Sequence, residues 1–164
     1  MELQSKKMNI MDIIQTFLTA MLPVAELRLA IPVAISKLGI PWYYALPTAI
    51  IGNLIPVFIL VPGLAIVTKW TQHFPHPFST IINWWFTHTK KKHKSKFERY
   101  GGPALIFLVA LPLPFTGAWS GSLASWLFQI PTKQGILFIL IGVVISGIAV
   151  TLLTLAGMGF TSVF

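Results

Sequence analysis

The chain has 164 residues, of which 55% are hydrophobic and only 10% are charged, and its mean hydropathy is +0.77. A soluble globule of this length needs more polar side chains to cover its surface, so the composition indicates an integral membrane protein. The chain has no cysteine, which excludes disulfides, iron–sulfur clusters and thiol catalysis.

The first apolar segment is broken by prolines into two short arms. Ile10–Leu22 has 13 residues, about 20 Å of helix, whereas the hydrocarbon core of a bilayer is about 30 Å thick. Pro23 ends this arm, and the expected return arm, Pro32–Leu38, is shorter still. Glu26 and Arg28 lie between the two prolines. Two short apolar arms around a polar tip predict a re-entrant helical hairpin instead of a spanning pair.

A long uncharged run follows the first hairpin, from Gly39 to Thr68, and predicts a transmembrane helix that begins at Pro41. Asn53 is a polar residue inside this helix, and an interhelical hydrogen bond is its simplest explanation. The polar region 69–100 comes next. Within it, residues 78–88 (FSTIINWWFTH) predict an interfacial helix, and residues 90–99 (KKKHKSKFER) predict a basic linker that touches anionic lipid head groups and not nucleic acid.

A second hairpin and a second long helix complete the chain. Residues 101–111 form a short apolar arm, the stretch PLPFTGAWSGS forms a broken tip, and residues 123–130 form the return. From residue 134 to the end no Asp, Glu, Lys or Arg appears, which predicts another transmembrane helix. The net charge of +8 is concentrated around the linker. The positive-inside rule therefore predicts a multi-pass protein of the cell membrane, with linker 90–99 cytoplasmic and both termini outside.

Proline and glycine positions recur along the chain. Pro131 follows Pro41 by 90 residues (131 − 41), and Gly142 follows Gly52 by 90 (142 − 52). A hairpin returns to its own side and the next helix then crosses, so the second copy must run inverted. We therefore predict an all-α integral membrane protein, a single membrane domain over residues 1–164 with two inverted repeats of hairpin plus helix. Repeat one covers 10–68, the interfacial helix and linker cover 69–100, and repeat two covers 101–160, which is a transporter design.

No enzymatic site is predicted. The tetrapeptide AWSG, residues 118–121, is one residue short of the motif of intramembrane serine proteases, but all four histidines lie in the central polar region, so the serine has no evident base. The His73 and His76 pair is broken by Pro75 and has no accompanying carboxylate or cysteine, so no metal site is predicted. No phosphate-binding glycine loop is present either. We expect no cofactor.

The charged tip needs an explanation, since a charged side chain at the bilayer centre costs at least about 2.5–3.5 kcal/mol on insertion scales. Glu26 and Arg28 either hold the tips together or handle substrate and protons. Arg28 suits a phosphate or carboxylate, and a desolvated Glu26 suits proton exchange. Gly117, Gly121 and Ser125 form a small-residue stripe that packing alone explains. The predicted binding residues are Glu26, Arg28, Thr116, Trp119 and Ser120, supported by Asn53, Pro23, Pro32, Pro112, Pro114, Gly117 and Gly121.

Three sequence blocks carry a resemblance to a known family: LPVAELRLAIPVA, GNLIPVFILVPG and YGGPALIFLVALPLPFTGAWSGSLAS. They resemble the small multi-drug export protein family and, more distantly, the DedA superfamily. The resemblance covers nearly the whole chain from about Ile10 and implies a membrane transporter with paired re-entrant hairpins. DedA relatives are implicated in recycling polyprenyl-phosphate lipid carriers and in proton-linked homeostasis. The tip from Leu111 to Ser125 has no charge, so the additional arginine-rich motif of DedA proper is missing here.

These observations leave three functions open. The first is a proton-coupled transporter of an anionic amphiphile such as a polyprenyl phosphate. The second is a proton-coupled exporter of small cationic or lipophilic compounds, and the third is a non-transporting membrane scaffold. The expected partners are membrane lipids, the anionic lipid or small-molecule substrate, and protons, with no nucleic acid. A homo-oligomer is left open.

Overall fold

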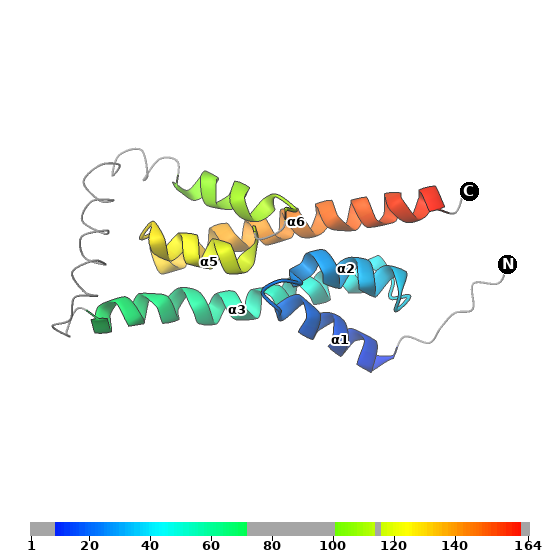
Figure 1. The fold of residues 1–164 in the computed structure, drawn as a ribbon, viewed down its shortest axis with the longest axis horizontal. Coiled ribbons are helices and arrows are strands. Elements are labelled where there is room, and N and C mark those ends of the chain that lie inside the picture. The colour runs from blue at the N-terminus through cyan, green and yellow to red at the C-terminus, as the bar shows by residue number, and fades with distance from the viewer. Residues whose placement is uncertain (1–8, 72–100, 114–115, 162–164) are drawn as a thin grey trace. The chain divides into compact units, whose positions relative to one another are not determined.

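The computed structural model describes residues 9–71, 101–113 and 116–161. All regular structure in these ranges is helical, with no β-strand, which confirms the predicted all-α class. The predicted interfacial helix 78–88 and linker 90–99 lie outside the described residues. The helices are α1 (Ile10–Met21), α2 (Glu26–Ser36), α3 (Trp42–Thr71), a helix over Gly101–Ala110, α5 (Ala118–Leu127) and α6 (Thr132–Thr161) (Figure 1).

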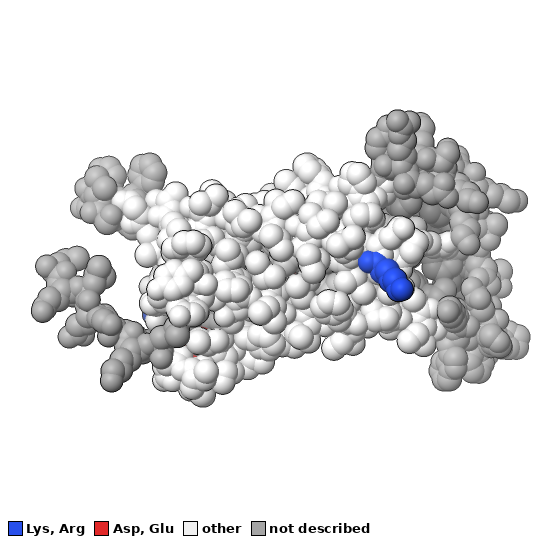
Figure 2. Space-filling view, turned by 180° about the vertical axis from the view of Figure 1, so that it is seen from behind, with Lys and Arg blue, Asp and Glu red and all other residues white. Residues whose placement is uncertain are grey.

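Two of these helices, α3 and α6, are long and apolar enough to cross a membrane, and each has 30 residues. Many of their apolar side chains point outward: Ile59, Ile66, Leu152 and Leu153 are each more than 60% exposed. The described surface on the face drawn in Figure 2 is almost free of charge. An apolar surface of this kind is unfavourable in water and is expected where lipid tails surround a protein.

The helices form two compact units. Unit one is Met1–Ile55 with Val143–Phe164, and unit two is Pro56–Gly142. Unit one therefore contains the hairpin of α1 and α2, which pack against each other, with the first part of α3 and the second part of α6. Unit two contains the hairpin of the 101–110 helix and α5, with the remaining parts of α3 and α6. Each unit has one hairpin and a segment of both long helices.

The 90-residue offset predicted from the prolines is also present in the helix bounds, because α6 begins 90 residues after α3 begins (132 − 42) and ends 90 residues after α3 ends (161 − 71). The buried positions recur in the same way. Ala45, Ala49 and Gly52 are buried in α3, and Gly135, Ile139 and Gly142 are buried in α6. The inverted relation of the two copies stays a prediction.

A glycine brings each long helix close to the first arm of a hairpin. In unit one, a methyl group on Gly52 would lie 2.5 Å from the backbone oxygen of Phe17 in α1. In unit two, a methyl group on Gly142 would lie 2.6 Å from Cβ of Val109 and 3.0 Å from the backbone oxygen of Ile106. Each hairpin is thus held against a helix backbone at a position where only glycine fits without movement.

Both hairpins differ from the prediction at the return arm. In the second hairpin, α5 begins at Ala118, so the expected broken tip through residue 122 and return over residues 123–130 were wrong. The first hairpin shows the same kind of difference. The tip consists of residues 22–25 only, and α2 begins at Glu26, so the expectation that the return starts at Pro32 was wrong. Pro32 lies inside α2, where it removes one helical hydrogen bond, the one to the carbonyl of Arg28. After Pro32 the Lys37 N–H still donates to the carbonyl of Val33 at 3.0 Å, and the Ser36 hydroxyl donates to the carbonyl of Pro32 at 2.5 Å. One lost bond was not enough to end the helix.

Both hairpins end with a residue in the left-handed backbone conformation. Gly39, after α2, has a φ of 68°, and Gln129, after α5, has a φ of 54°. Both residues directly precede an Ile-Pro pair. The Ile40 N–H then donates to the carbonyl of Ala34 at 2.9 Å, and the Ile130 N–H donates to the carbonyl of Ser125 at 2.9 Å. A left-handed residue therefore turns each return arm into the following long helix.

Substitutions at the two left-handed residues, Gly39 and Gln129, are predicted to change the free energy of unfolding in opposite directions. Gln129→Gly should raise the free energy of unfolding, and Gly39→Gln should lower it, each by about 1 kcal/mol, because the left-handed region strains every residue with a Cβ. No heavy atom lies within 4 Å of a Cβ built on Gly39, so the loss there would be purely conformational. Thermal unfolding of the purified protein in detergent measures both. A lower stability for Gln129→Gly would contradict the prediction and show that contacts of the glutamine outweigh its strain.

Candidate functional site

Glu26 is a buried acid in an unusual backbone conformation. Its side chain is only 5% exposed, and its φ is 46°, in the left-handed region, at the start of α2. Its N–H donates to the carbonyl of Leu22 across the tip at 3.0 Å. Such a conformation costs of the order of 1–3 kcal/mol for a residue other than glycine, and it persists where the surroundings fix it, most often at functional sites. The tip of the first hairpin thus holds a carboxylate in a fixed, strained position.

Arg28 follows in the first turn of α2 and is partly buried. The charges of Glu26 and Arg28 interact electrostatically. Both residues belong to helix α2. The irregular backbone is confined to Glu26 and the short tip before it. The sequence left open whether these charges hold the structure or act on a ligand, and their mutual interaction is compatible with both roles.

The second tip is held by side-chain hydroxyls. The Thr116 hydroxyl donates to the carbonyl oxygens of Leu111 and Leu113, at 2.8 and 2.9 Å. The Ser120 hydroxyl accepts from the N–H of Gly117 at 2.7 Å and so caps the start of α5. The sequence predicted Thr116 and Ser120 as binding residues. In the structure their hydroxyls organise the broken backbone of the tip, a local role that the sequence did not reveal.

The small-residue stripe of Gly117, Gly121 and Ser125 is buried along its whole length. A methyl group on Gly121 would lie 2.5 Å from the side chain of Val109. The Ser125 hydroxyl lies directly against the backbone of Gly135 in α6. The stripe is therefore a helix-packing surface inside unit two, which agrees with the interpretation of its glycines as structural.

Asn53 behaves differently from the prediction. Its side chain is 0% exposed, yet neither its amide nitrogen nor its oxygen has a hydrogen-bond partner among the described residues. The expected interhelical hydrogen bond was wrong. Ser146 in α6 is in the same state, with 2% exposure and no partner for its hydroxyl in the described part of the chain. Sequence reasoning missed Ser146 because serine is common in membrane helices and bonds readily to its own backbone.

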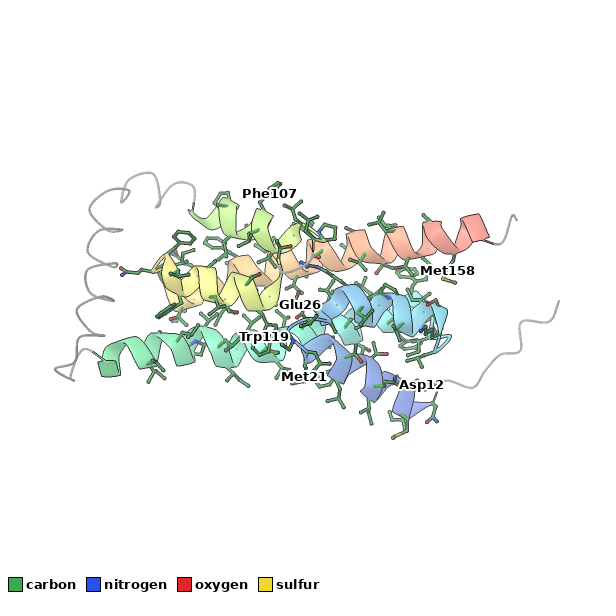
Figure 3. All side chains as sticks on the ribbon, in the orientation of Figure 1. Asp12, Met21, Glu26, Phe107, Trp119 and Met158 are labelled. Atoms are coloured by element: carbon green, nitrogen blue, oxygen red, sulfur yellow. The ribbon has the colours of Figure 1, made fainter. Side chains whose placement is uncertain are left out.

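The predicted binding residues fall in both units. Glu26 and Arg28 belong to unit one, whereas Thr116, Trp119 and Ser120 belong to unit two. Figure 3 labels Glu26 at the start of α2 and Trp119 near the start of α5. Each hairpin thus presents its predicted residues next to its tip, and a site shared by the two tips stays a prediction. Among the described residues no group of three His, Cys, Asp or Glu side chains is placed to hold a metal ion.

Comparison with known families matches residues 26–149 to the family described as "Putative small multi-drug export protein". Searches of curated proteins and of solved structures returned no match. The matched region begins at Glu26, includes both tips, and covers more than half of the chain. With the two long apolar helices and the nearly uncharged face already described, this match places the protein among membrane proteins. The chain belongs to the small multi-drug export protein family.

Proposed function

We propose that the protein is a proton-coupled membrane transporter of an anionic amphiphile, such as a polyprenyl phosphate lipid carrier. The observation that supports this most is the pair Glu26 and Arg28. A buried carboxylate and a partly buried guanidinium interact at the tip of a helical hairpin, in a chain whose long helices expose apolar side chains. Charged groups are retained inside membrane proteins chiefly where they serve a pathway.

In this proposal the two charges have different tasks. The guanidinium of Arg28 binds the phosphate head group, because its planar set of N–H donors matches phosphate oxygens. Glu26 exchanges the proton, since a carboxylate in a dry site can change charge within the physiological range. An anion bound to Arg28 would neutralise the positive charge that stabilises the carboxylate of Glu26. Glu26 would then bind a proton more readily. Proton uptake and substrate binding would thereby be coupled.

The second hairpin would complete the binding site with Thr116, Trp119 and Ser120. This part of the proposal rests on the sequence, which predicts two inverted copies with broken tips near the middle of the membrane, and on the resemblance to the DedA superfamily. Alternating access would then follow from movement of the hairpins against the two long helices.

The family description favours a second candidate, the export of small cationic or lipophilic compounds. There the carboxylate of Glu26 would be the shared site for the cation and the proton. A non-transporting scaffold is the third candidate, in which the charge pair only stabilises the fold.

Charge substitutions distinguish the candidates. For the anion carrier, Arg28→Ala should weaken binding of a short-chain isoprenyl phosphate to the purified protein by tenfold or more, because a charge-assisted hydrogen bond contributes about 1.5–3 kcal/mol. Glu26→Gln should keep binding and lose the dependence of liposome uptake on a pH gradient. Lys37→Ala is the matched control, since Lys37 is an exposed cation at the end of the same helix.

The other candidates give different results. A cation exporter would lose binding of a lipophilic cation in Glu26→Gln and keep it in Arg28→Ala. If wild-type protein moves neither probe, and both variants only melt at lower temperature, the pair is structural and the transport proposal is rejected.

A further inference from the structure

The two long helices differ in their proline content. Helix α3 contains three prolines, Pro47, Pro56 and Pro62, whereas α6, which also has 30 residues, contains none. Proline has no N–H, and its ring crowds the carbonyl four residues earlier, so each proline removes a helical hydrogen bond and makes a kink easier. Of the two long helices, α3 is therefore the one that can bend.

Pro56 differs from the other two prolines in its position. The boundary between the two units falls between Ile55 and Pro56. The carbonyl of Gly52 would normally accept the N–H of residue 56, and proline offers none. In α6 the corresponding residues, 90 positions later (142 − 52 and 146 − 56), are Gly142 and Ser146, and serine has an N–H. The missing hydrogen bond is therefore specific to α3.

A buried amide weakens the same turn of α3. Asn53 directly follows Gly52 and is 0% exposed, and neither its side-chain nitrogen nor its oxygen has a hydrogen-bond partner among the described residues. A buried polar group without a partner destabilises the conformation that leaves it unbonded. A bend that gives this amide a partner or a water molecule would remove that cost. The turn between Gly52 and Pro56 thus lacks both a backbone bond and side-chain bonds.

A bend at this turn would move the first hairpin. A methyl group on Gly52 would lie 2.5 Å from the backbone oxygen of Phe17 in α1, and α1 packs against α2. The first hairpin is therefore in contact with α3 on the N-terminal side of Pro56, whereas residues 57–71 lie on the other side of it. In the second copy Gly142 lies equally close to Val109 of the 101–110 helix, but no proline follows in α6.

We propose that α3 bends at Pro56 and carries the first hairpin, with Glu26 and Arg28, relative to the later part of α3, while α6 keeps its shape. Sharp kinks in helices arise chiefly at proline, and a hinge of a few residues is enough to let packed groups of helices move as bodies. The inference deepens the proposed function and rests on it for the use of the movement, which is to change access to Glu26 and Arg28.

The test is the distribution of distances between two spin labels, measured by pulsed electron paramagnetic resonance on the full-length protein in detergent without substrate. The chain has no cysteine, so the labels attach only to introduced ones. Leu18→Cys and Ile66→Cys join the first hairpin to the later part of α3. Phe107→Cys and Ala156→Cys join the second hairpin to the later part of α6. All four residues are exposed.

The two pairs are matched in their spacing. Ile66 lies 14 residues beyond Gly52 (66 − 52), and Ala156 lies 14 residues beyond Gly142 (156 − 142). Each label on a long helix is therefore about 21 Å along the axis from the glycine that contacts its hairpin. A difference in width between the two distributions then reports a difference in bending between α3 and α6.

In the chain with its natural prolines, the first pair should give a wider distribution of distances than the second. Pro56→Ala should narrow it to the width of the second pair, because alanine restores an N–H for the Gly52 carbonyl. Asn53→Leu should narrow it as well, since it removes the polar group that the packed helix leaves unbonded. Pro62→Ala is the matched control, a proline in the same helix and between the same labels, and should leave the distribution wide.

Several results would overturn the proposal. Equal widths for the two pairs would show that α3 bends no more than α6. A distribution that stays wide in Pro56→Ala, or that narrows in Pro62→Ala, would place the movement elsewhere. If Pro56→Ala does not fold, Asn53→Leu decides the question, and a distribution that stays wide in it rejects the hinge. No substrate is present in these measurements, so failure of the hinge and failure of the transporter proposal are separable.

Discussion

Arg28→Met is expected to lower the free energy of unfolding by about 1–3 kcal/mol, because it removes the positive charge that interacts with the buried carboxylate of Glu26. Glu26→Gln should cost less. Glu26 is 5% exposed, whereas Arg28 is only partly buried, and its long side chain can carry the charge toward polar surroundings. The double variant Glu26→Gln, Arg28→Met should recover most of the loss, since it buries no uncompensated charge. Denaturation of all three variants in the same detergent gives the coupling between the two side chains.

Lys37→Met is the control for this cycle, because it removes an exposed positive charge from the end of α2 and should change stability by less than about 1 kcal/mol. If the two single losses simply add up in the double variant, the charges of Glu26 and Arg28 do not support each other. The electrostatic interaction would then have no consequence for stability.

Gly52→Ala and Gly142→Ala are each expected to lower the free energy of unfolding by about 1–3 kcal/mol, the usual range for overpacking a well-filled site. The new methyl group at Gly52 would meet the backbone oxygen of Phe17 at 2.5 Å, and that at Gly142 would meet Val109 at 2.6 Å. A backbone oxygen cannot move aside as the end of a flexible side chain can. The hairpin must therefore shift away from the long helix in each case.

Each long helix provides its own control. Gly63 in α3 and Gly157 in α6 have no heavy atom within 4 Å of an added methyl group. Gly63→Ala and Gly157→Ala should leave stability unchanged or raise it by up to about 1 kcal/mol through helix propensity. Melting temperatures of the four variants show whether an added methyl group is harmful only at Gly52 and Gly142. Equal losses at all four positions would show that the hairpin contacts are not what makes Gly52 and Gly142 sensitive.

Much of the architecture was accessible from the sequence because apolar length and proline placement determine it. Runs without charge predicted α3 and α6. The offset between Pro41 and Pro131 predicted the offset between the starts of these helices. Both return arms begin earlier than the sequence predicts. Pro32 removes only one hydrogen bond within α2 and does not end it, and α5 begins at Ala118, inside the stretch predicted as a broken tip.

The chemistry of the candidate site was less accessible. Composition drew attention to Glu26 and Arg28, since charges are rare in apolar segments. The left-handed backbone at Glu26 could not be predicted, because glutamate has no preference for it and the surrounding tip imposes it. The hydrogen bonds of Thr116 and Ser120 within the second tip depend on a backbone path that no spacing rule describes. For the same reason the partnerless state of Asn53 and Ser146 became visible only in the packed helices.

The division of α3 and α6 between the two units determines which fragments of the chain contain a whole unit. Unit one takes residues from both ends of the chain, Met1–Ile55 and Val143–Phe164, and unit two takes the middle, Pro56–Gly142. A polypeptide that stopped after the first repeat would hold only part of either unit, and so would one that began at the second. Neither repeat therefore contains all the residues of either unit. We therefore expect each hairpin to pack against its full set of helix segments only when both repeats are present.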